Sequence, residues 1–147
     1  MRDQIYSSVS FISACVSAFK GVRLPWIGSD KDPLYKEYKY HTGIDVYGKS
    51  VYTYAPGVVL AVGSEDNLYT VTVQYDAFSC LRYGHLSSVE VEAGDVVQAG
   101  YRVGIADKYL HFEYATKEKR TSVWPVRVGS QVYYKQDPAL MIGVKND

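Results

Sequence analysis

The chain has only three histidines, His41, His85 and His111. The first is followed four residues later by Asp45, in the segment HTGID. Imidazole and carboxylate groups both bind zinc, and a catalytic zinc ion usually takes three protein ligands and one water. A straight strand would hold these two side chains about 13 Å apart, but Gly43 permits a bend or bulge that brings them together. The pair alone is a weak metal signal, because polar residues at this spacing are often simply solvated.

The segments around the other two histidines strengthen that signal. His85 lies in YGHLS and His111 lies in YLHFE. Each is inside or at the end of a run with strand character, which would hold the side chain rigidly. Three histidines in three such contexts are hard to explain as independent core residues.

Together these segments resemble the lysostaphin-type (LytM-like) zinc endopeptidases, which cleave peptide bonds in bacterial peptidoglycan. The family pattern is His-x-x-x-Asp, then Tyr-x-His, then His-x-His followed by Phe-Glu, and HTGID, YGHLS and YLHFE occur here in that order. The intervening segments APGVVLAVG and VEAGDVVQAGYRVG also match, so the resemblance covers about residues 38–115. It implies that His41, Asp45 and His111 bind Zn²⁺ and that His85 is catalytic.

One position departs from the family pattern. The first histidine of His-x-His, a second catalytic residue in the family, is Tyr109 here. Residues two apart in a strand share a face, so we expect Tyr109 and His111 to face one groove. A phenol is a poor general base at neutral pH, but it can donate a hydrogen bond to a developing oxyanion. Two interpretations stay open: an active enzyme in which His85 does the acid–base work while Tyr109 stabilises charge, or a catalytically impaired zinc-binding structural or wall-binding module.

Strands must position these residues, because the chain has a β pattern from about residue 50 onward. Short runs rich in Val, Tyr and Thr predict strands at 50–55, 58–62, 69–75, 89–91, 102–106 and 109–114. In one of these runs Val71, Val73 and Tyr75 alternate with polar residues, as in a strand with one buried face. We expect a mainly β fold: a single compact antiparallel β-sheet domain of the lysostaphin type, with long loops around a zinc groove. Glu113 is either an outer partner of the metal site or an exposed strand carboxylate.

Length and composition fit one domain, residues 1–147, with 47% hydrophobic residues to form a core. Its peptidase-like part is expected at about 38–115, preceded by an N-terminal segment and loop (1–37) and followed by a closing hairpin or tail (116–147). The segments GVVLAVG and GDVVQAG also resemble turns of lipoyl and biotinyl carrier domains. Those domains need an exposed lysine at a hairpin tip between the two segments, and no such lysine is present.

The charge balance excludes several partners. The chain has sixteen basic and sixteen acidic residues, so it lacks the positive electrostatic field of a protein that binds nucleic acids or membrane surfaces. No stretch approaches the roughly 20 apolar residues of a membrane-spanning helix. The resemblance described above implies instead that the partners are the peptides of bacterial peptidoglycan.

The site of action is inferred from the habits of the resembled family, whose cellular members are usually exported with a signal, a pro-segment or a wall-binding domain. No convincing signal is recognised here, so we expect a bacteriophage virion protein: a tail-tip or tail-knob lysin that aids genome entry and contacts other tail proteins. The alternative is a lipoprotein of the bacterial envelope, because ISAC resembles a processing box with Cys15 as the acylated residue. The plainer interpretation of that segment is a packed opening strand or short helix, with Cys15 and Cys80 structural and not paired.

Overall fold

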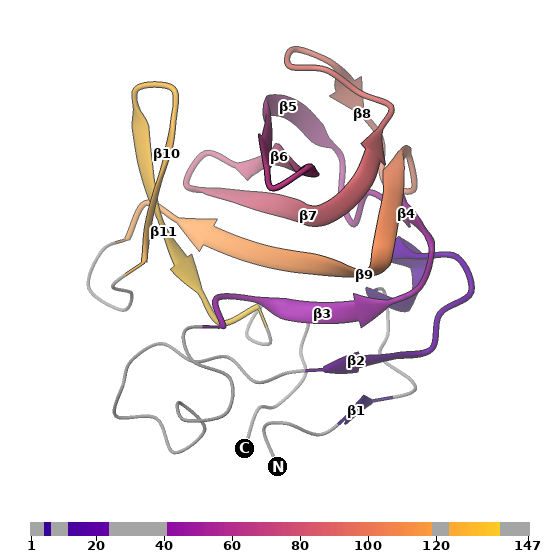
Figure 1. Ribbon diagram of the computed structural model, residues 1–147. Helices are drawn as coiled ribbons and strands as arrows, with labels where there is room; N and C mark the ends of the chain where they lie inside the picture. The colour runs from indigo at the N-terminus through magenta and orange to yellow at the C-terminus, as the bar shows by residue number, and fades with distance from the viewer. Residues whose placement is uncertain (1–4, 7–11, 24–40, 119–123, 139–147) are drawn as a thin grey trace.

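The computed structural model describes residues 5–6, 12–23, 41–118 and 124–138, and these form a mainly β domain (Figure 1). In chain order the elements are β1 (Ile5–Tyr6), the 3-10 helix η1 (Ile12–Cys15), β2 (Gly21–Arg23), β3 (Ile44–Tyr47), β4 (Ser50–Tyr52), β5 (Gly57–Glu65), β6 (Leu68–Asp76), β7 (Ser79–Val89), β8 (Val96–Val97), β9 (Arg102–Thr116), β10 (Pro125–Val128) and β11 (Gln131–Gln136). The predicted fold class is confirmed. Most of the predicted N-terminal segment and loop (1–37), namely residues 1–4, 7–11 and 24–37, lies outside the described residues.

Strand β9 organises the sheet. The strand pairs of the described residues are all antiparallel, and the main path runs β1, β2, β3, β9, β7, β6, β5, β8. One edge of β9 pairs with β7, while its other edge pairs in succession with β4, β3 and β11. Figure 1 shows β9 turning sharply, and Lys108 within it has a left-handed φ of 77°. This long, bent strand brings distant segments of the chain side by side.

Alternation along β3 and β9 separates an apolar face from a polar face. The apolar face lies in the main core and includes the fully buried Ile44, Val46, Leu110 and Phe112. The polar face carries the alternate residues Asp45, Tyr47, Tyr109, His111 and Glu113. The register of β3 and β9 pairs Asp45 directly with His111. Two predicted metal ligands are therefore neighbours because of strand pairing.

Several predicted strand bounds were wrong. The runs 102–106 and 109–114 form one strand, β9, which continues through the polar residues of its bend. Strand β7 was not predicted as a long strand, because SCLRYGHLSSV lacks a run of β-branched residues. It ends at Val89, whereas a separate strand was expected at 89–91, and β4 is shorter than the predicted run 50–55.

The predicted burial pattern of β6 is only half correct. Val71 and Val73 are buried as expected, but Tyr75 is 37% exposed because it lies near the end of the strand. Thr72, expected on the solvent side, is buried, and its hydroxyl accepts a hydrogen bond from Arg82 Nε at 3.3 Å. The polar face of the sheet is therefore partly covered by its own side chains.

The two ends of the described chain both pack on the sheet. Ile12 and Cys15 of η1 are buried in the main core, which supports the packed opening segment. The predicted closing hairpin is present as β10 and β11, which pair with each other. Cys15 and Cys80 are both buried and are not joined in a disulfide. Among the described residues no helix has the length and hydropathy needed to cross a membrane.

Candidate metal site and groove

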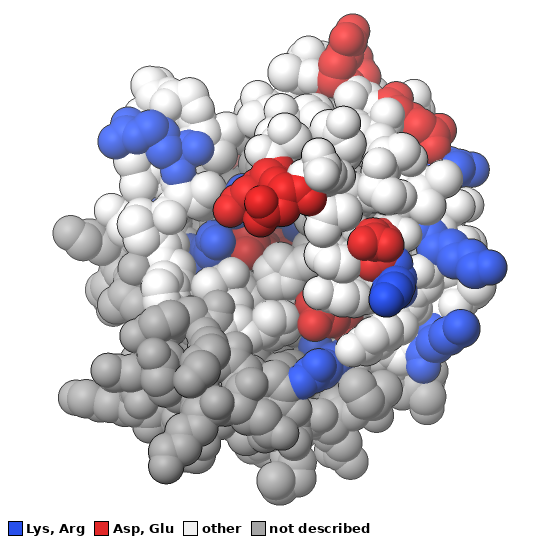
Figure 2. All heavy atoms as spheres, in the orientation of Figure 1, with Lys and Arg blue, Asp and Glu red and all other residues white. Residues whose placement is uncertain are grey.

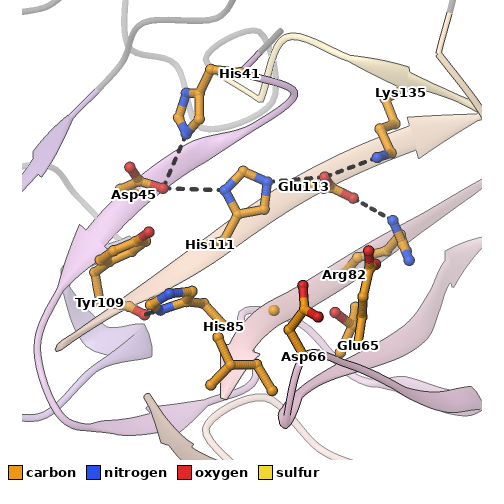
Figure 3. A pocket seen from close by; sticks show the side chains of 13 residues that line it. His41, Asp45, Glu65, Asp66, Arg82, His85, Tyr109, His111, Glu113 and Lys135 are labelled. Carbon is orange, nitrogen blue, oxygen red and sulfur yellow. Dashed lines mark hydrogen bonds and ion pairs between the residues drawn. The ribbon is translucent and has the colours of Figure 1, made fainter. Parts of the chain in front are cut away.

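The three predicted metal ligands converge at the beginning of β3. His41 precedes the strand, Asp45 lies within it and His111 comes from the neighbouring β9. Asp45 Oδ1 is 3.1 Å from His41 Nε2 and 3.1 Å from His111 Nδ1. The rings of the two histidines meet edge to face, with centroids 5.1 Å apart. Two ring nitrogens thus point at one carboxylate oxygen (Figure 3).

Gly43 makes this convergence possible. The chain bends at Gly43, and β3 begins only at Ile44, so His41 is not held about 13 Å away as it would be in a straight strand. A Cβ atom at this glycine would lie 2.5 Å from the main-chain oxygen of Phe112 and 3.0 Å from His111 Cε1. Any larger residue would push the bend away from β9.

The donor atoms fit a zinc ion. One ligand atom from each of His41, Asp45 and His111 lies within 4.8 Å of the others. Zinc bonds of about 2.0–2.2 Å in a tetrahedron separate the ligand atoms by about 3.3–3.6 Å, close to the 3.1 Å contacts found here. Two imidazoles and one carboxylate are typical zinc donors, and three protein ligands leave a position for water or substrate.

Glu113 fixes the orientation of the His111 ring. Its Oε2 lies 2.9 Å from His111 Nε2 and accepts that hydrogen, which turns the Nδ1 edge of the ring towards Asp45. Burial lowers the pKa of His111, but the hydrogen bonds that its ring donates to the Asp45 and Glu113 carboxylates outweigh this and raise it to about 9 when no metal is bound. Burial alone would raise the pKa of each carboxyl group, yet their hydrogen bonds to His111 hold both pKa values well below the usual range. Of the two alternatives for Glu113, the structure gives the buried outer partner.

Further polar and charged residues surround Glu113, and none of them was predicted from the sequence. Thr42 Oγ1 donates to Glu113 Oε2 at 2.7 Å, Lys135 Nζ lies 3.2 Å from the same oxygen, and Arg82 donates to Oε1. These residues come from segments far apart in the chain. No local spacing in the sequence signals their meeting, although each is an ordinary polar residue on a strand or at a strand end.

The two predicted catalytic residues lie next to each other beside the metal ligands. The rings of His85 and Tyr109 are stacked, with centroids 4.0 Å apart and an interplanar angle of 9°. His85 Nδ1 is 3.3 Å from the main-chain oxygen of Tyr109, and His85 has a left-handed φ of 63°. Burial, followed by the nearby Asp45 carboxylate, raises the pKa of the Tyr109 phenol, so this group stays neutral.

One cavity of about 420 Å³ contains all five predicted site residues. Its lining also includes Arg82, Glu113 and Lys135, together with the exposed Glu65 at the end of β5 and Asp66 in the turn that follows (Figure 3). Figure 2 shows that acidic and basic side chains lie close together around a hollow in this face. The sheet therefore presents a polar, open groove in which the candidate metal ligands and the two predicted catalytic residues are neighbours.

Comparison with known proteins shows which family the region around this groove resembles. A family model described as Peptidase family M23 matches residues 39–123. No curated protein sequence matches the chain.

Solved structures share the fold. One is the catalytic domain of an alanine-to-histidine mutant of EnpA, a prophage-encoded M23 protein from Enterococcus faecalis, with 23% identity, a TM-score of 0.52, and coverage of 67% of this chain and 76% of that one. Another is the catalytic domain of the antimicrobial peptidase lysostaphin from Staphylococcus simulans, with 21% identity, a TM-score of 0.54, and coverage of 73% and 82%. A chain of the SpoIIIAH–SpoIIQ complex has 20% identity, a TM-score of 0.57, and coverage of 79% and 87%.

Proposed function

This chain belongs to peptidase family M23, and we propose that it is a zinc-dependent endopeptidase that hydrolyses cross-links or stem peptides of bacterial peptidoglycan. The observation that carries the proposal is the convergence of His41, Asp45 and His111 in one cavity with His85 and Tyr109. The cell-wall substrate is supported by the fold shared with lysostaphin, an antimicrobial peptidase.

The metal ligands and His85 have distinct roles in this mechanism. Bound zinc would polarise the scissile carbonyl and lower the pKa of a water ligand. The carbonyl oxygen of Tyr109 can only accept, so the hydrogen bond to it places the His85 proton on Nδ1. Nε2 of His85 then carries a lone pair and can take a proton from the attacking water as a general base. Stacking on Tyr109 and the constrained backbone of His85 fix the ring in that orientation.

Tyr109 would stabilise charge in the groove. Its raised pKa keeps the phenol protonated at neutral pH, so it donates a hydrogen bond and does not act as a base. Figure 3 shows the Tyr109 ring between His85 and the Asp45–His111 pair. A donor at this place could stabilise the oxyanion of a tetrahedral intermediate.

The second candidate function is a catalytically impaired module that binds zinc for structure or binds the wall. The observation that favours it is the tyrosine at position 109, where the resembled family has a catalytic histidine. Losing one positioned acid–base group typically costs about 10²- to 10⁴-fold in rate. The intact set of three metal ligands favours the active enzyme over this alternative.

For the site of action we propose the virion of a bacteriophage, at the tail tip or knob, where the protein would contact other tail proteins. A prophage-encoded M23 protein with the same fold supports this location. The envelope lipoprotein remains the alternative, and the burial of Cys15 in the core favours the virion. Mass spectrometry of purified phage particles and of bacterial membrane fractions tests the location: recovery of lipid-modified Cys15 would contradict it.

Zinc content and hydrolysis of purified peptidoglycan test the function. We expect about one zinc per chain and cleavage by the wild type. Asp45→Ala should lose both, and His85→Ala should lose cleavage by about 10²- to 10⁴-fold while keeping zinc. Cleavage only in Tyr109→His would establish the impaired module instead, and loss of zinc in His85→Ala would make His85 a ligand.

A further inference from the structure

Lys135 reaches the candidate metal site from a part of the chain beyond the family match. The match ends at residue 123, and Lys135 lies in β11 of the closing hairpin. The register of β11 and β9 pairs Lys135 with Ala115. Ala115 and Glu113 share a strand face, so Lys135 and Glu113 are diagonal neighbours across the pair. The contact of Nζ with the Glu113 carboxylate, at 3.2 Å, is therefore a consequence of strand register.

Packing of the hairpin holds Lys135 at this place. Tyr133, two residues before it, is only 3% exposed and packs with the buried Cys80 and Ala115. The side chain of Lys135 is itself only 19% exposed, although lysine is usually among the most exposed residues. The fold therefore keeps an ammonium group at the wall of the cavity that contains the metal ligands.

One oxygen of Glu113 connects Lys135 to the metal site. Oε2 contacts Thr42 Oγ1 at 2.7 Å, His111 Nε2 at 2.9 Å and Lys135 Nζ at 3.2 Å. Lys135 Nζ also lies 3.4 Å from Thr42 Oγ1, so it closes the cluster. A buried carboxylate is costly unless it is paired, and Arg82 pairs only with the other oxygen, Oε1.

We propose that Lys135 is a positioning residue of the metal site: it holds the Glu113 carboxylate, which in turn holds the His111 ring with Nδ1 towards the metal. Without the ammonium group, Oε2 would attract water from the cavity, and its hydrogen bond to His111 would loosen. The inference rests on the proposed function for the identity of the metal. On this proposal the closing hairpin, which lies outside the family match, contributes a residue that positions the metal ligands.

The test is the zinc dissociation constant, measured by competition with a chromophoric chelator and without substrate. Lys135→Met removes the charge and keeps an unbranched side chain, and we expect it to weaken zinc binding by about 10- to 100-fold, the usual effect of losing an outer partner. Lys135→Arg keeps the charge and should restore affinity close to wild type. Lys117→Met is the control, because Lys117 contacts the hairpin over the Tyr133 ring but does not line the cavity.

A double-mutant cycle with Glu113→Gln separates positioning from general stabilisation. If Lys135 acts through Glu113, Lys135→Met changes zinc affinity little in the Glu113→Gln background. The thermal midpoint of each metal-free variant is measured alongside, and the comparison uses Lys135→Gln if Lys135→Met is unfolded. Fully additive effects on affinity would overturn the proposal.

The same set of proteins distinguishes this inference from the proposed function. Wild-type zinc affinity in Lys135→Met, with a raised KM, would make Lys135 a substrate contact and overturn the inference while the function stands. Zinc binding that depends on Lys135, without any hydrolysis of peptidoglycan, would overturn the function and support the inference. A wild-type protein that binds no zinc would overturn both.

Discussion

The two faces of β3 and β9 are made of alternate residues of the same segments, yet they are held in different ways. On the apolar face, Leu110 and Phe112 are fully buried among other apolar side chains. On the polar face, His111 and Glu113 have a few specific partners at 2.7–3.2 Å. Dispersion and burial on the first face are spread over many contacts, whereas each contact on the second has one geometry.

This difference indicates that the apolar face mainly determines the stability of the fold and that the polar face mainly determines the chemistry of the site. The polar face carries buried carboxylates that need cationic partners, and it lies beside the strained backbone of His85 in β7. Both features are costly for folding. The apolar face offsets that cost. Changes on the apolar face should therefore lower the free energy of unfolding, while changes on the polar face should mainly alter metal binding and turnover.

The largest expected effect comes from Phe112→Ala on the apolar face. Phe112 is fully buried and its ring packs edge to face on Tyr83 with centroids 5.5 Å apart, so we expect a loss of about 3–5 kcal/mol in the free energy of unfolding. Urea denaturation of the metal-free protein measures it. Phe78→Ala is the matched control, because Phe78 is 70% exposed and should change stability by less than about 0.5 kcal/mol. Equal losses in the two variants would contradict the assignment of the core.

Gly43→Ala tests whether the bend before β3, which packs against both Phe112 and His111, sets the position of His41. The added methyl group would crowd the main-chain oxygen of Phe112 and the ring of His111, so we expect a loss of about 1–3 kcal/mol in unfolding free energy together with weaker zinc binding. Urea denaturation and chelator competition measure the two effects. Gly63→Ala is the control, since a methyl group there meets no atom within 4 Å. Unchanged zinc affinity in Gly43→Ala would mean that the bend does not set the position of His41.

The fold class and the five candidate site residues could be predicted from sequence because their signals are local. Strand character, turn residues and the segments HTGID, YGHLS and YLHFE each occupy a few neighbouring positions. The bend at Gly43 could also be expected, because only a glycine allows His41 and Asp45 to meet so close to another strand.

The cluster around Glu113 could not be predicted in the same way. Its members Thr42, Arg82 and Lys135 meet through the register of β9 with β3, β7 and β11, and register is a property of the whole sheet. The extent of β7 was missed for a related reason: its polar residues are tolerated because neighbouring strands cover them. Long-range pairing overrides local propensity at both places.

The smallest expected effect, Thr72→Val, tests whether the polar face behaves as separate contacts or as one network. Thr72 is buried and accepts a long hydrogen bond, 3.3 Å, from Arg82 Nε, while a different nitrogen of Arg82 holds Glu113. We expect a loss of about 0.5–1.5 kcal/mol in unfolding free energy and an unchanged zinc dissociation constant, since Arg82 keeps its stronger, charge-assisted partner. Thr70→Val, at a half-buried position of the same strand, controls for the loss of a threonine hydroxyl that does not contact Arg82 in the described structure. A fall in zinc affinity as large as that expected for Lys135→Met would show that the Arg82 side of Glu113 carries positioning too, because a perturbation three contacts away would then reach His111.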